Sequence, residues 1–121
     1  MSRWLARLFH RLLRLVRASE KAGATEVQEA ANCALAALRV GKAVHALHLL
    51  GNDAQLSEST GRSIRCALLR LQYLQAASAK ALPFLQAVAA RIAPRHPYHA
   101  HLLRLASQHI AQPPDFIAAS P

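Results

Sequence analysis

The sequence is poor in the residues that build small β-proteins. Only 5% of its 121 residues are aromatic and only four are glycine, whereas sandwiches and barrels of short strands are rich in aromatic and β-branched residues and in turns. Hydrophobic residues nevertheless make up 53% of the chain, which is too many for a disordered protein. The composition therefore predicts an all-α protein in which residues 1–121 form a single helical domain.

Signatures of catalysis and of metal binding are also missing. The chain has six acidic residues but no paired carboxylates, no His-Glu-x-x-His segment and no glycine-rich phosphate loop. Cys33 and Cys66 do not have the spacing of a metal site, and we expect both as reduced, buried thiols in a cytoplasmic protein. His45 and His48 fall on one helical face, but two ligands are too few, so we expect satisfied core histidines. We predict no enzyme, no cofactor, no metal and, without an apolar run of about eighteen residues, no transmembrane helix.

Periodicity and helix-ending residues divide the chain into four to five helices that form a bundle. We expect them at residues 2–19, 25–50, 60–82, 83–93 and 97–111, followed by an irregular tail at 112–121. Gly51 is expected to end the second helix in a left-handed conformation. The third helix is expected to be capped by Ser59 or Thr60 and broken by Pro83. The helix at 25–50 is apolar over most of its circumference, which predicts a central element wrapped by the others.

The first helix separates apolar from basic residues completely. An arc of roughly 180° holds only apolar residues, and these are Trp4, Leu5, Leu8, Phe9, Leu12, Leu13, Leu15 and Val16. The opposite arc contains His10 and five arginines but no acid, and the arginines are Arg3, Arg7, Arg11, Arg14 and Arg17. Like charges four residues apart on a helix each cost a few tenths of a kcal/mol. The arginine arc therefore predicts an anionic partner.

The apolar arc of this helix has four interpretations. It packs on the protein's own core, docks on a partner chain, lies on a membrane surface, or belongs to a cleavable mitochondrial presequence. Burial separates these interpretations. Burial of Trp4, Leu8 and Leu12, with Arg3, Arg7 and Arg14 outside, favours contact with nucleic acid. Exposure of Trp4, Leu8 and Leu12 favours a membrane or a partner protein.

Positive charge is also concentrated later in the chain. The net charge is +9, made up of +5 in residues 1–19, −2 in residues 20–58 and +6 in residues 59–121. The helix at 60–82 carries a second basic face with an aromatic residue between the charges, which suits phosphate groups and a stacked base. An excess of this size and sign implies an anionic partner.

In size, helicity and basicity the chain resembles the small helical-bundle subunits of RNA-guided ribonucleoprotein complexes. We predict a non-enzymatic accessory subunit that contacts a nucleic-acid backbone, DNA or RNA, within a larger ribonucleoprotein or protein complex. The predicted binding residues are Arg3, Arg7, Arg11, Arg14, Arg62, Arg65, Tyr73 and Lys80. The alternative is an adaptor that uses residues 2–19 to bind an anionic membrane surface or a partner protein.

Overall fold

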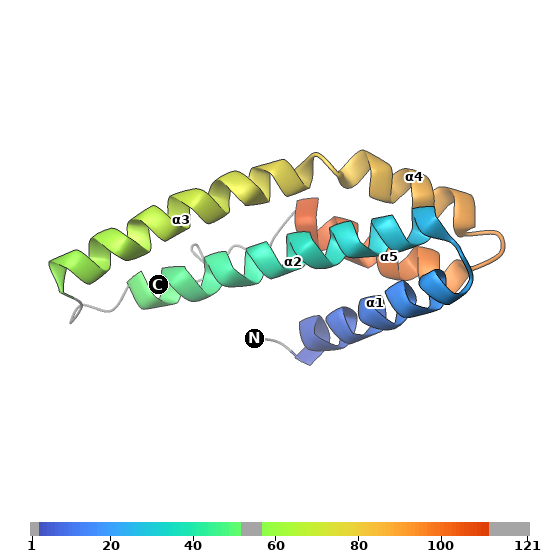
Figure 1. The fold of residues 1–121 in the computed structure, drawn as a ribbon, viewed down its shortest axis with the longest axis horizontal. Coiled ribbons are helices and arrows are strands. Elements are labelled where there is room, and N and C mark those ends of the chain that lie inside the picture. Colours follow the sequence, from blue (N-terminus) through green and yellow to red (C-terminus); the bar gives the residue numbers. More distant parts are fainter. Residues whose placement is uncertain (1–2, 52–56, 112–121) are drawn as a thin grey trace.

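The computed structural model describes residues 3–51 and 57–111, which form five α-helices and no strand. The helices are α1 (Arg3–Lys21), α2 (Thr25–Gly51), α3 (Glu58–Ala79), α4 (Leu82–Ile92) and α5 (Pro97–Ala111). Figure 1 shows α2 running through the length of the molecule, with α1 and α3 on opposite sides of it. The prediction of an all-α helical bundle is confirmed.

The turn between α1 and α2 depends on a glycine. Gly23 is the only residue with a positive φ in the part of the chain that the structure describes, at 68°. Its N–H donates to the carbonyl of Glu20, and the N–H of Ala24 donates to the carbonyl of Ser19, which is the Schellman arrangement at a helix end. The expectation for Gly51 was wrong, because Gly51 is the last residue of α2 and does not have a left-handed backbone.

Pro83 separates α3 from α4 as predicted. It lies in the first turn of α4, where the N–H that proline lacks has no acceptor within the helix. The predicted cap of α3 was wrong, since the N-cap is Ser57 rather than Ser59 or Thr60. The Ser57 hydroxyl oxygen accepts a hydrogen bond from the Thr60 backbone N–H at 3.3 Å, so α3 begins earlier than the sequence indicated.

The hydrophobic core lies where α1, α4 and α5 surround the N-terminal half of α2 (Figure 1). α2 contributes Ala30, Ala31 and Ala34, all fully buried, and these small side chains let the neighbouring helices approach closely. Larger side chains from the surrounding helices fill the space, and the fully buried ones are Leu12, Leu85, Val88, Leu102 and Leu103. The central position predicted for this helix holds for its N-terminal half.

The other half of α2 pairs with α3 in an arm that extends away from the core (Figure 1). We define the arm as residues 39–51 together with α3. Val44 is the only buried residue in this part of α2, and α3 has none. The predicted wrapping of α2 by the other helices therefore holds for its N-terminal half and not for the arm. The arm also leaves apolar side chains exposed, and these are Leu49, Leu50, Leu69, Tyr73 and Leu74.

The expectations of burial for the two cysteines and for the two histidines of α2 also fail. Cys66 is exposed on α3, and Cys33 is half-buried against the core; both are free thiols. His45 and His48 are half-buried in the arm. The Nε2 atom of His48 is buried without a hydrogen-bond partner among the described residues, so this histidine is not the satisfied core residue that was predicted.

α2 is long and apolar enough, by length and composition, to cross a membrane, whereas the sequence predicted no transmembrane helix. Within its most apolar stretch, 28% of the residues are buried in the structure. A core helix also meets these criteria of length and composition, so they do not by themselves assign α2 to a membrane.

Candidate functional site

The orientation of α1 is set by its leucines. Leu5, Leu8, Leu12 and Leu15 are between 0% and 6% exposed. Trp4 and Leu13, at the two margins of the apolar arc, are 46% and 36% exposed. The leucines therefore pack on the protein's own core, as the first interpretation expects. Trp4, which the nucleic-acid interpretation expected to be buried with Leu8 and Leu12, is exposed instead.

The arginines of α1 lie on the outside of the bundle. Arg3, Arg7, Arg11, Arg14 and Arg17 are all exposed, and none of them forms an ion pair with a described residue. By contrast, Arg91 of α4 is paired with Glu26 of α2. Both members of that pair are about half exposed, so the pair contributes at most about 1 kcal/mol. The charge of α1 is left available to an external partner.

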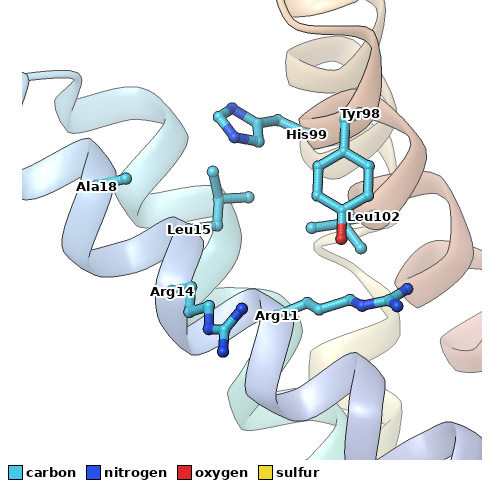
Figure 2. Close-up of a pocket in the computed structure, with 7 residues that line it drawn as sticks. All are labelled: Arg11, Arg14, Leu15, Ala18, Tyr98, His99 and Leu102. Carbon is cyan, nitrogen blue, oxygen red and sulfur yellow. The ribbon is translucent and has the colours of Figure 1, made fainter.

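A pocket of about 160 Å³ lies between α1 and α5 (Figure 2). The polar residues of its lining are Arg11, Arg14, Tyr98 and His99. Figure 2 shows the Arg11 guanidinium extending toward the side of Tyr98, whereas the Arg14 guanidinium turns away from Tyr98 and His99. Its apolar wall consists of Leu15, Ala18 and Leu102. No carboxylate from the described part of the chain lines the pocket. In Figure 2 the Tyr98 hydroxyl points toward the side of Arg11, and the His99 ring reaches toward α1.

Burial favours the neutral form of two histidines of α5, His99 and His109. Burial lowers the pKa of His99 below 6.5, and the His96 ring, stacked on it at a centroid distance of 5.4 Å, lowers that pKa further. In the last turn of α5, the ring centroid of His109 lies 5.8 Å from that of Trp4. Burial lowers the pKa of His109 as well. Near pH 7 the His99 ring therefore offers one donor and one acceptor rather than a charge.

The predicted residues of α3 lie on a different surface. Arg62, Arg65, Tyr73 and Lys80 are exposed along one face of that helix. Because α1 and α3 pack on opposite sides of α2 (Figure 1), the eight predicted residues form two separate groups. The sequence could not show this separation, since the order of helices around α2 depends on packing between distant segments.

Sequence reasoning missed Tyr98 and His99 as partners of the α1 arginines. No cluster of three metal-binding side chains occurs among residues 3–51 and 57–111. A tyrosine and a histidine at the start of a helix carry no strong signal by themselves. Packing of α5 against Arg11 and Arg14 is what makes them a site.

Comparison of the chain with protein-family models, with curated proteins and with solved structures finds no match. Its function must therefore be inferred from the residues and their placement.

Proposed function

We propose that the protein is a non-enzymatic nucleic-acid-binding helical bundle that contacts the phosphate backbone through α1, as a basic subunit of a larger assembly. The placement of α1 supports this most. Its leucines are used in the core, so the surface that α1 offers to a partner is its row of arginines. The row from Arg3 to Arg17 is about 21 Å long at ~1.5 Å per residue. A nucleic-acid backbone presents a matching line of phosphates, which guanidinium groups bind in a bidentate manner.

A membrane surface fits α1 less well. An interfacial helix inserts its apolar face about 5–10 Å into the lipid, but here Leu8 and Leu12 are core residues at 3% and 0% exposure. Insertion of this face would require the bundle to open. The arginine row, in contrast, contacts a polyanion without any change in the fold.

The arm supports a second candidate function, that of an adaptor for a partner protein. Leu50 and Leu69 are 55% and 69% exposed, and Tyr73 is 75% exposed. Leu69 and Tyr73 are four residues apart, so they lie on one face of α3, and grouped exposed apolar side chains mark interaction surfaces more often than isolated ones do. This contact is compatible with the first function, because a subunit of an assembly needs both a nucleic-acid surface and a protein surface.

The salt dependence of binding tests the first function. We compare Arg7→Gln/Arg17→Gln on α1 with Arg39→Gln/Lys42→Gln on α2, because each pair removes two exposed positive charges. The dissociation constant for a fluorescent oligonucleotide is measured by anisotropy over a range of salt concentrations. Each lost phosphate contact reduces the log–log slope by about 0.7 to 0.9. We expect this reduction for the α1 variant and an unchanged slope for the α2 variant.

Two results would contradict the proposal: no binding of any nucleic acid at low salt, or the same change of slope in both variants. The second result would mean that only net charge matters and that α1 is not a specific surface. Arg62→Gln/Arg65→Gln measures the contribution of α3 in the same assay. Thermal unfolding followed by circular dichroism checks that each variant is folded.

A further inference from the structure

The size of the pocket between α1 and α5 limits what it can hold. Its volume of about 160 Å³ is below the ~300–1,000 Å³ of sites that enclose a whole small molecule. It is nevertheless more than one water molecule needs. The pocket is therefore suited to a single polar group that belongs to a larger ligand.

The lining of the pocket favours a phosphate group. Arg11 and Arg14 are three residues apart, so they project from the same side of α1, and each guanidinium has a planar set of N–H donors that matches phosphate oxygens. The Tyr98 hydroxyl and the neutral His99 ring add hydrogen-bond donors without adding charge. A backbone phosphodiester, with one negative charge and two free oxygens, fits this combination of two cations and two neutral donors.

The exposure of Tyr98 indicates whether the ligand is single-stranded or double-stranded. The residue is 53% exposed at the edge of the pocket, and its ring is tilted by 56° against His99 rather than stacked on it. The ring is therefore open to a flat partner from outside. Bases stack on protein aromatic rings when they are not already stacked in a duplex, so an exposed ring beside a phosphate site favours a single strand.

We infer that the pocket is a subsite for single-stranded nucleic acid, in which Arg11 and Arg14 hold one backbone phosphate and Tyr98 stacks on the adjacent base. The inference rests on the proposed function. It adds the strand state of the ligand and names the residue that selects it. The rest of the arginine row attracts any polyanion, whereas Tyr98 distinguishes a free base from a paired one.

The test compares single strands with duplexes. Anisotropy is measured with a labelled mixed-sequence single strand, as RNA and as DNA, and with duplexes of the same length at one low salt concentration, using the full chain. We expect the wild type to bind single strands more tightly than duplexes. Tyr98→Leu should weaken single-strand binding roughly 5- to 150-fold and leave duplex binding nearly unchanged. Tyr98→Phe, which keeps the ring, should retain the preference.

Two control variants test whether the preference for single strands comes from the pocket between α1 and α5. Tyr73→Leu removes an even more exposed tyrosine from α3 and should leave the preference for single strands intact. Arg11→Gln/Arg14→Gln should weaken single-strand binding more than Arg39→Gln/Lys42→Gln does, although both remove two charges. Tyr98, Arg11 and Arg14 are exposed, and circular dichroism confirms that each variant is folded.

The results distinguish a failure of the proposed function from a failure of the single-strand subsite. Failure of the wild type to bind any nucleic acid refutes the proposed function and this inference together. Binding that is equal for single strands and duplexes refutes only the inference, as does a single-strand preference that survives Tyr98→Leu or disappears in Tyr73→Leu.

Discussion

Replacement of Leu12 by alanine is expected to remove a large part of the stability of the bundle. Leu12 is 0% exposed and belongs to the core cluster that α1 forms with α2, α4 and α5. Truncation of a fully buried leucine to alanine costs about 2–5 kcal/mol, and the cost rises with the cavity that remains. The residues that α2 contributes to this cluster include Ala30, Ala31 and Ala34, which have no side-chain rotamers that could fill such a cavity. We therefore expect about 3–5 kcal/mol, out of the ~5–15 kcal/mol that stabilises a domain.

Leu13→Ala is the matched control, because it makes the same chemical change at the next position of the same helix. Leu13 is 36% exposed, so its truncation exposes less new surface and water can occupy the space that is left. We expect a cost of about 1 kcal/mol. Urea unfolding followed by circular dichroism measures both variants. With a slope of about 2 kcal/mol per M, the midpoint should fall by about 2 M for Leu12→Ala and by about 0.5 M for Leu13→Ala.

Equal midpoints for the two variants, or a loss below about 1 kcal/mol for Leu12→Ala, would refute the reasoning. The apolar arc of α1 would then not be part of the core. It would be free to bind a membrane or a partner, and the main support for nucleic-acid binding through the arginine row would be lost.

Two further predictions concern the backbone and pH. Gly23→Ala should destabilise the protein by about 1–2 kcal/mol, because φ is 68° there and a side chain is strained in the left-handed region. Gly41 lies in the interior of α2, and an added β-carbon there would meet only an ordinary van der Waals contact at 3.9 Å. Gly41→Ala should therefore stabilise the protein by about 0.5–1 kcal/mol. Urea midpoints that change in the opposite directions would contradict these two predictions. The pKa values of His99 and His109 are lower in the folded protein than their ordinary value of 6.5, so the unfolded chain binds protons more readily and stability should fall as the pH drops below about 6.5. His109→Gln should reduce the difference between the urea midpoints measured at about pH 7.5 and about pH 5.5, and an unchanged difference would show that His109 does not contribute.

The helices were predictable because their signals are local. The apolar arc of α1 and the break at Pro83 depend only on neighbouring residues, and both occur where they were expected. The turns were less predictable, since several residues near each helix end have suitable chemistry. Gly23 follows α1 and Gly51 is the last residue of α2, but only Gly23 adopts the left-handed conformation. Whether the chain turns there depends on how the next helix packs.

The candidate site was predictable only on one of its two sides. Segregation of charge along α1 identified Arg11 and Arg14 without any structure. Tyr98 and His99 are far from them in the sequence, and only the packing of α5 against α1 places these residues around one pocket. For the same reason the sequence could not show that the basic face of α3 is separate from the α1 arginines, because α1 and α3 pack on opposite sides of α2.

The placement of α1 also decides which experiments can separate binding from folding. Deletion of residues 1–19 would remove Leu12 and three other core leucines together with the arginines, so a loss of binding would follow from unfolding alone. Exchange of exposed arginines avoids this problem, and it has a favourable side effect. Arg3, Arg7 and Arg11 are like charges at successive four-residue intervals, so each exchange for glutamine removes about 0.2–0.5 kcal/mol of repulsion. Variants that are as stable as the wild type or more stable, yet bind nucleic acid more weakly, would show that these arginines serve the ligand at the expense of the fold.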